Sequence, residues 1–123
     1  MACGTNFYDH CFPKDSVTLG FSSNCAHWLR DKPCDMTGTT CHLFITVPEE
    51  KVKFRAQAEK DWGLYLTKRA AEISPGGSMV LVELAIVEHG HFTGQTPETV
   101  GIFRMLSTLW KSLSDEGIIK SLR

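Results

Sequence analysis

The most regular pattern of apolar and polar positions in the chain runs over residues 48–73. Apolar side chains recur there at spacings of three and four, which is the period of a helix with one buried face. Pro48 fits the first helical position, and Glu49 and Glu50 suit the positive end of a helix. The pattern therefore predicts one long amphipathic helix, with an apolar stripe made of Phe54, Ala58, Trp62, Tyr65, Leu66, Ala70 and Ile73.

Two short apolar runs on either side of this helix indicate strands. The first run, residues 17–21, starts with a β-branched valine, and the second, 78–85, contains four consecutive apolar residues, as in a strand covered on both faces of a parallel sheet. The Ser-Pro-Gly-Gly segment at 74–77 predicts a turn between helix and second strand. Together these segments predict an α/β fold with a parallel βαβ unit and a right-handed crossover.

The remaining segments are predicted with less regular patterns. The apolar run 42–47 predicts a short strand or extended segment. A second helix is predicted to start at 96–98, where a capping threonine precedes proline and glutamate, and to end at Gly117. Loops are predicted over 1–16, with one helical turn at 6–11, and over 30–41 and 86–95.

The polar segment that follows the first strand is the best candidate for a binding site. Ser22, Ser23 and Asn24 are residue types that cap a helix N-terminus, and a short helical turn over 25–29 is predicted before Pro33. In open α/β sheets, ligands bind outside the carboxyl ends of the strands. Asn24, His27 and Trp28 are therefore expected where a small molecule would bind.

Composition limits the class of protein. A chain of 123 residues with a net charge of −1 is one domain at most and has no basic surface, so nucleic-acid binding is not expected. No apolar run approaches the roughly 18 residues that a membrane helix needs. The N-terminal residues have neither the basic start nor the apolar centre of a signal peptide, so we expect a cytoplasmic protein.

The cysteines and histidines give no clear metal or disulfide pattern. The five cysteines form an odd set without a Cys-x-x-Cys pair, which favours free thiols in a reducing compartment. Cys41-His42 and the pair His89 and His91 carry ligand-type side chains, but no second ligand pair follows at finger-like spacing. We therefore expect no metal site, and a small metal protein is the weakest of the three hypotheses for function; the other two are given at the end of this section.

Three stretches of the chain resemble a known family. They are NFYDHCFP at 6–13, SSNCAHWL at 22–29 and QAEKDWGLYLTKRAAEISPGGSMVL at 57–81. Their order and spacing are similar to those of the S-adenosylmethionine-dependent carboxyl methyltransferases, the salicylate, jasmonate, indole-acetate and caffeine type plant enzymes and their bacterial relatives. The resemblance covers most of this chain but only the middle of the family's longer sequence. It implies a partial Rossmann-like methyltransferase fold over 1–123, a single partial domain whose two strands are the fourth and fifth of a seven-stranded sheet, followed by a C-terminal helix.

The resemblance also implies a substrate site. In the family, a tryptophan of the strand-turn-helix segment donates its indole N–H to the substrate carboxylate, and Trp28 matches it. Asn24 and His27 match positions that line the acyl pocket, and both would make that pocket more polar. Plain core packing of Trp28, and a surface-turn position for Asn24 and His27, are the alternatives.

The same resemblance implies where the methyl donor, S-adenosylmethionine, would be bound. The family's Ser-Phe-Tyr segment lies against the adenosine, and here it reads Asn6-Phe7-Tyr8, with asparagine replacing the serine. Ser22 is the fourth candidate for donor contact. Alternatively, the aromatic residues of this segment fold back onto the core. Gln57 and Asp61 also match family positions, and a solvated or capping position is their alternative reading.

Some parts of the family pattern have no counterpart in these 123 residues. No Asp-x-Gly-x-x-x-Gly pattern follows either strand, and the family's carboxylate-binding glutamine lies upstream of the match, so we expect the chain alone to be inactive and assign no catalytic residue. A sheet of two or three strands leaves bare edges, which favours a homo-oligomer or a domain-swapped dimer. The leading hypothesis is a fragment of a carboxyl O-methyltransferase acting on a small organic acid. The second is a non-catalytic binding or assembly module that retains half of the fold.

Overall fold

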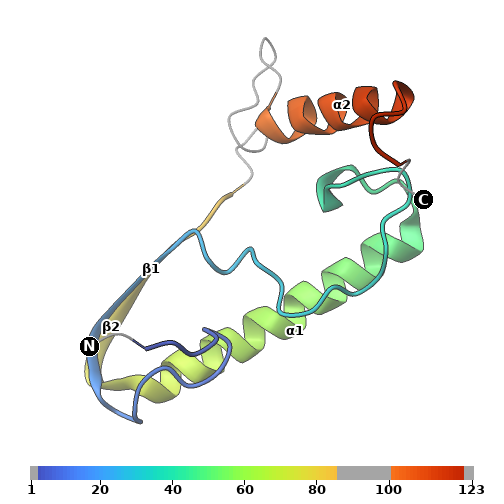
Figure 1. The fold of residues 1–123 in the computed structure, drawn as a ribbon. Coiled ribbons are helices and arrows are strands. Elements are labelled where there is room, and N and C mark those ends of the chain that lie inside the picture. Colours follow the sequence, from blue (N-terminus) through green and yellow to red (C-terminus); the bar gives the residue numbers. More distant parts are fainter. Residues whose placement is uncertain (1–2, 86–100, 121–123) are drawn as a thin grey trace. The chain divides into compact units, whose positions relative to one another are not determined.

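The computed structural model describes residues 3–85 and 101–120 (Figure 1). Its contacts divide into two compact units, one made of residues 1–32 and 55–83 and the other of 33–54 and 84–123. In chain order the elements are β1 (Val17–Ser23), a 3-10 helix (His42–Phe44), α1 (Pro48–Glu72), β2 (Ile73–Val82) and α2 (Ile102–Asp115). No helix in the described part of the chain has the length and apolarity needed to cross a membrane.

Helix α1 confirms the strongest prediction from the sequence, since it begins at Pro48 and ends one residue before the predicted end. Its buried side differs from the predicted apolar stripe. Tyr65 is buried, but Trp62 and Leu66 are exposed. The other fully buried residues of the helix are acids, Asp61 and Glu72. The helix therefore presents a polar set of side chains to the first unit, and these take part in the candidate site.

Strands β1 and β2 form a two-stranded parallel sheet among the described residues, as the βαβ pattern predicts (Figure 1). Strand β2 begins at Ile73 rather than at residue 78, because the predicted turn over 74–77 lies inside the strand as an irregularity. The register moves from Val17 opposite Ile73 to Leu19 opposite Ser78.

Glycine makes this irregularity sterically possible. Gly76 has a φ of 79°, in the region that favours glycine. A Cβ on Gly77 would lie 2.9 Å from each of three atoms, two of them the backbone oxygens of Thr18 and Ser74. The Ser74 hydroxyl donates a hydrogen bond to the Val17 carbonyl at 3.1 Å, which ties the displaced backbone to β1.

Two predictions of local structure are wrong, the strand or extended segment over 42–47 and the helix cap at 22–24, whereas the turn predicted over 25–29 is present. Residues 42–47 form no strand, and the 3-10 helix His42–Phe44 lies there instead. Ser22 and Ser23 belong to β1 rather than to a helix cap, and Asn24 has a left-handed φ of 52°, whereas an N-cap residue typically has extended backbone. The segment after it is a single turn closed by the Trp28 N–H to the Cys25 carbonyl at 3.1 Å.

The second helix confirms its predicted end but not its start. Helix α2 ends at Asp115, and Gly117 follows with a φ of 73°. The N–H groups of Gly117 and Ile118 donate to carbonyls of the last turn, as in a glycine-terminated helix. The predicted start at 96–98 and the predicted loop 86–95 lie outside the described residues.

The first unit leaves part of its sheet uncovered. Tyr8 and Tyr65 are its buried aromatic residues, whereas Leu19 and Phe21 of β1 are 70% and 72% exposed. These two side chains alternate with Gly20 along the strand and so share one face, and Phe21 lies opposite Val80, which is also exposed. An apolar sheet face is therefore left without a covering element among the described residues.

Candidate active site

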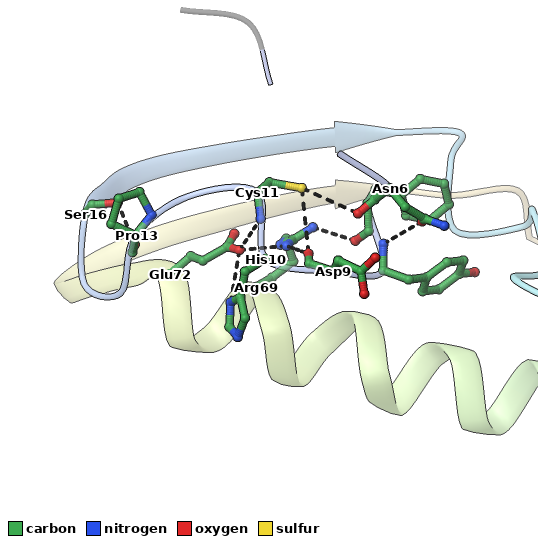
Figure 2. A network of polar contacts seen from close by, with 10 residues as sticks. Asn6, Asp9, His10, Cys11, Pro13, Ser16, Arg69 and Glu72 are labelled. Atoms are coloured by element: carbon green, nitrogen blue, oxygen red, sulfur yellow. Dashed lines mark hydrogen bonds and ion pairs between the residues drawn. The ribbon is translucent and has the colours of Figure 1, made fainter. Parts of the chain in front are cut away.

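The turn at residues 6–11 is shaped by short-range hydrogen bonds (Figure 2). The Asn6 side-chain oxygen accepts the Tyr8 N–H at 3.0 Å, and the Asn6 carbonyl accepts the Asp9 N–H at 2.9 Å. These bonds confirm a turn in this segment, although they do not attach it to the rest of the unit.

Attachment comes from two charged residues near the end of α1. Arg69 donates from Nη1 to the Phe7 carbonyl and from Nη2 to the Asp9 carbonyl, both at 2.7 Å. Glu72 accepts the Cys11 N–H at 2.7 Å, and Arg69 and Glu72 bind each other at 2.8 Å. Figure 2 shows these contacts converging between α1 and the turn. Together the two side chains hold the backbone at Phe7, Asp9 and Cys11.

The surroundings of Glu72 keep it ionised. Burial alone would raise the pKa of this carboxyl group, since its side chain is 2% exposed. Hydrogen bonds from Arg69 and from the backbone N–H groups of Cys11 and Phe12 outweigh burial and lower the pKa of Glu72 below its usual value. For Arg69, burial acts to lower the pKa, but the Glu72 carboxylate raises it overall. The pair is therefore a buried, charged, hydrogen-bonded ion pair.

Tyr8 joins this turn to the segment that follows β1. Its ring is buried, and its hydroxyl donates to the Trp28 carbonyl at 2.6 Å. Burial, with the nearby negative charge of Asp61 second, raises the pKa of Tyr8, so the hydroxyl keeps its proton. The backbone of Trp28 is thereby fixed relative to the turn.

Asp61 holds the same segment from the other side. This carboxylate is buried and accepts the Arg30 N–H at 2.9 Å and the Gln57 side-chain amide at 2.8 Å. A solvated position for Asp61 is therefore wrong. Two buried side chains, Tyr8 and Asp61, bind the backbone on both sides of Leu29.

Trp28 itself projects away from the core. Its side chain is among the exposed aromatic residues of the chain, at 66%, so the core-packing alternative is wrong. His27 lies beside it, with ring centroids 5.3 Å apart, and the His27 Nδ1 lies 3.9 Å from the carboxylate of Glu83. The Ala26 N–H donates to Glu83 at 3.3 Å. The carboxyl end of β1 is thus followed by an exposed indole on a backbone held by buried hydrogen bonds.

A cavity of about 590 Å³ lies in the same unit. Residues 17–22 of β1 all line it. Only alternate residues of a strand point to one face of a sheet, so this unbroken run indicates that the cavity lies along the edge of β1. Phe7, Ser22 and Tyr65 also line it, and the Phe7 and Tyr65 rings meet edge to face with centroids 6.1 Å apart. The Ser22 hydroxyl lies 2.8 Å from the Cys25 sulfur.

The predicted site residues fall into two groups. Phe7 and Ser22 lie together at the cavity, and Asn6 is exposed at the turn beside them. Trp28, His27 and Asn24 lie together after the end of β1, exposed to solvent. Tyr8 is the exception, because it is buried and its hydroxyl is already used by Trp28.

The cavity suits the adenosine part of a nucleoside donor. Adenine needs an apolar or aromatic wall, which the Phe7 ring provides, and the ribose needs hydroxyl or amide partners, of which the lining carries the Ser22 hydroxyl. Asn6 lies in the adjoining turn, where its side-chain oxygen accepts the Tyr8 N–H. The charged residues of the lining, Arg69 and Glu72, are already engaged with the turn, so the site fits the adenosine rather than a charged amino-acid group.

Sequence reasoning assigned no site role to four residues that build this site. Asp61, Tyr65, Arg69 and Glu72 follow one another at helical spacings of four, four and three, so they share the face of α1 that meets the turn. The signal was available, since three ionisable side chains recur on one stripe with a tyrosine. The prediction missed the three charged residues because it considered only apolar and aromatic side chains as the buried face of the helix.

The described residues also bear on the metal hypothesis. No group of three or more histidine, cysteine, aspartate or glutamate side chains suited to a metal ion gathers within 3–85 and 101–120. His89 and His91 lie outside these ranges. All five cysteines carry free thiols.

Comparison with known proteins identifies the family. Residues 1–123 match the family described as SAM dependent carboxyl methyltransferase. The chain is 32% identical over 118 residues to anthranilate O-methyltransferase 2 of Zea mays, covering 94% of this chain and 31% of that enzyme. It is 34% identical over 121 residues to anthranilate O-methyltransferase 3 of the same plant, with the same coverage.

A solved structure shows the same fold. Loganic acid methyltransferase with SAH superimposes with a TM-score of 0.73 at 26% identity, over 97% of this chain and 36% of that one. The fold is therefore a partial α/β methyltransferase fold, and the chain belongs to the S-adenosylmethionine-dependent carboxyl methyltransferases. The cofactor of this family is S-adenosylmethionine, and SAH is its demethylated product. The chain spans about a third of the length of the maize enzymes it matches, 31%.

Proposed function

We propose that this chain forms part of an enzyme that transfers a methyl group from S-adenosylmethionine to the carboxylate of a small organic acid. One observation carries this proposal most directly. Trp28 presents an exposed indole after the carboxyl end of β1, on a backbone fixed by Tyr8. An indole N–H is a donor with no acceptor beside it, and so it suits a carboxylate oxygen.

Each predicted site residue has a place in this proposal. Trp28 donates to the acceptor carboxylate, and Asn24 and His27 line the acyl group. Phe7 packs on the adenine, while Asn6 and Ser22 bind the adenosine through an amide and a hydroxyl. Tyr8 serves indirectly, by fixing Trp28. Support comes from the shared unit that holds both groups and from the lining of the cavity.

The chemistry asks little of the protein beyond positioning. A carboxylic acid with a pKa of about 4 is ionised at neutral pH, so no general base is needed. The donor, when bound, supplies an electrophilic methyl group on a sulfonium. The residues of this chain have to hold the carboxylate oxygen at roughly 3 Å from that methyl and exclude water. This agrees with a site that has hydrogen-bond donors and aromatic walls but no assigned acid or base.

The acceptor is proposed as a class only. The relatives are named for anthranilate and loganic acid, which are both small carboxylic acids. Asn24 and His27 would add polar contacts to the acyl pocket, which favours an acid with a further polar group.

Titration calorimetry tests the proposal. We expect the chain to bind S-adenosylhomocysteine, and then anthranilate or benzoate in its presence. Trp28→Phe removes the indole N–H and keeps an aromatic ring, so it should weaken binding of the acid about tenfold, the loss expected for one hydrogen bond to a charged group. Trp110→Phe changes an exposed tryptophan on α2, so it is the matched control and should leave both affinities unchanged. Equal affinity of the parent and Trp28→Phe for the acid would contradict the proposal.

We propose in addition that turnover requires sequence beyond these 123 residues. Support comes from the sequence after β1 and after β2, since neither strand is followed by an Asp-x-Gly-x-x-x-Gly pattern. A methyl-transfer assay with labelled donor should therefore show no product from this chain alone. Product formation by the isolated chain would contradict this part of the proposal.

A second candidate function is supported by the uncovered sheet. Leu19 and Phe21 are exposed on β1, and the cavity runs along the free edge of the same strand. We propose on this basis that copies of the chain associate through β1, as a homo-oligomer or a domain-swapped dimer. A binding or assembly module without catalysis would share this property but not the affinity for the donor. The free thiols of the chain support placing either form in the cytoplasm.

A further inference from the structure

The turn that carries Phe7 depends on α1 for its position. Within the turn, the bonds that Asn6 makes set the local shape only. The hydrogen bonds that attach the turn elsewhere are those of the Tyr8 hydroxyl to Trp28 and those made by Arg69 and Glu72. A longer ion pair of Asp9 with Arg30, at 3.9 Å, and the ring contact of Phe7 with Tyr65 add to them. Arg69 binds the carbonyl of Phe7 itself, so it acts directly on the residue proposed to pack on the adenine.

The geometry of Arg69 is specific to a guanidinium group. One side chain reaches two carbonyls and one carboxylate at 2.7, 2.7 and 2.8 Å. It also lies over the Tyr65 ring, with 5.6 Å from its central carbon to the ring centroid. A planar group with five donors can do this, whereas the ammonium group of lysine cannot reach all three acceptors in one plane. Tyr65 in turn contacts Phe7, so Arg69 sets the ring and the backbone together.

The arrangement leaves one polar atom of Arg69 without a partner. The Arg69 Nε is buried and has no hydrogen-bond partner among the described residues. Buried N–H groups of this kind are uncommon because they cost free energy. The Nη groups of Arg69 thus bind the turn while its Nε–H stays unpaired. A side chain placed only to pair with Glu72 would not need to bind the turn in this way.

We infer that Arg69 and Glu72 are positioning residues for the methyl donor, which hold the 6–11 turn so that Phe7 meets the adenine. Both line the cavity, but the hydrogen bonds that they make go to the turn and to each other. This inference rests on the proposed function, since it assumes that the turn binds the donor. It adds a pair of residues, from a helix remote in sequence, through which donor affinity is set.

Two measurements on the full chain test the inference. The first is the affinity for S-adenosylhomocysteine by calorimetry, and the second is amide hydrogen exchange of residues 6–11. We expect Arg69→Lys to weaken binding about tenfold and to speed exchange in the turn by a similar factor, while α1 keeps its protection. Arg55→Lys, an exposed arginine on the same helix, is the matched control and should change neither.

A double-mutant cycle separates positioning from general stability. If Arg69 acts through Phe7, then Arg69→Lys should cost little more affinity once Phe7→Leu has removed the aromatic contact. Losses that simply add, together with a lower denaturation midpoint, would overturn the inference, as would unchanged affinity and unchanged exchange in Arg69→Lys. If the parent chain does not bind S-adenosylhomocysteine, the proposed function is contradicted. Exchange then decides whether the pair holds the turn, and unchanged exchange overturns that as well.

Discussion

Glu72 is the residue on which the polar contacts of the N-terminal turn converge. It accepts hydrogen bonds from Arg69 and from the Cys11 N–H, and the His10 Nδ1 lies 3.4 Å away. A carboxylate that is buried and satisfied in this way stabilises the fold only while it is charged. Residue-level effects on the site should therefore depend on pH.

The lowered pKa of Glu72 predicts a loss of stability in acid. Because the folded-state pKa lies below the unfolded value of about 4.3, the contribution of Glu72 is fully present above pH 4.3 and is lost as the pH falls through the folded value. Glu72→Gln should lower the free energy of unfolding at pH 7 by about 3 to 5 kcal/mol, since Arg69 is left buried without its counter-charge. It should also remove this part of the acid dependence.

Urea denaturation at a series of pH values measures both effects. Glu59→Gln, an exposed glutamate on the same helix, is the control and should behave as the parent chain does. An acid limb that is equally steep in the parent and in Glu72→Gln would contradict this assignment.

Single residues could be predicted where they belong to a family motif, but not where their position depends on contacts with distant loops. Trp28, Phe7 and Ser22 were found through the family motif, and the structure places the first after β1 and the others at the cavity. The buried positions of Asp61 and Glu72 were not predicted, because a charged residue on a helix usually faces solvent. Both acids are buried because they accept hydrogen bonds from backbone N–H groups of loops that pack over them. Those loops are distant in sequence.

At the scale of elements, the junction of α1 and β2 is where the sheet departs from regular pairing. The helix ends at Glu72 and the strand begins at the next residue, with the irregularity over 74–77 inside the strand. This irregularity lets β2 leave α1 without a loop and still pair with β1 in parallel. At Gly77 an added Cβ would lie only 2.9 Å from the backbone oxygen of Thr18 in β1.

Gly77→Ala is therefore predicted to destabilise the chain. The added Cβ would lie 2.9 Å from the oxygens of Thr18 and Ser74, which are backbone atoms that cannot turn away. We expect a loss of about 1 to 3 kcal/mol in the free energy of unfolding, as for other overpacked sites, measured by urea denaturation.

A second glycine provides the matched control. Gly63 lies inside α1, and a methyl group added there would have no atom within 4 Å, so Gly63→Ala should stabilise by up to about 1 kcal/mol through helix propensity. Equal effects of the two substitutions would show that steric contact at Gly77 is not the cause.

The long element could be predicted from its repeating pattern, and the short ones could not. The 25-residue helix α1 repeats its pattern over many turns, so its bounds came out nearly right. The six residues 42–47 have too few positions to separate strand from helix, and they contain a 3-10 helix. The turn predicted over 74–77 failed for another reason, since Pro-Gly-Gly also fits a strand irregularity, and only pairing with β1 decides between the two.

At the scale of the whole molecule, the uncovered face of the sheet has the widest consequence. Leu19, Phe21 and Val80 are exposed apolar residues on the two paired strands. An exposed strand with apolar side chains and a free edge favours pairing with another chain. The same surface would be available to further parts of a longer protein.

We therefore predict that the isolated chain associates with itself. Phe21→Lys places a charge on the exposed face and should shift the population toward monomer, measured by size-exclusion chromatography with light scattering. Val52→Lys is the matched control, because Val52 is similarly exposed but lies on α1. A monodisperse monomer of the parent chain would contradict the prediction.

The most direct test of the central claim follows the indole N–H of Trp28. The chain has three tryptophans, so a nitrogen-15 correlation spectrum should show three indole signals, and Trp28→Phe identifies one of them. On addition of anthranilate in the presence of S-adenosylhomocysteine, we predict a downfield shift of the Trp28 signal alone, because its N–H donates to the carboxylate. An unchanged Trp28 signal at saturating ligand, or a shift confined to Trp62 and Trp110, would contradict the account.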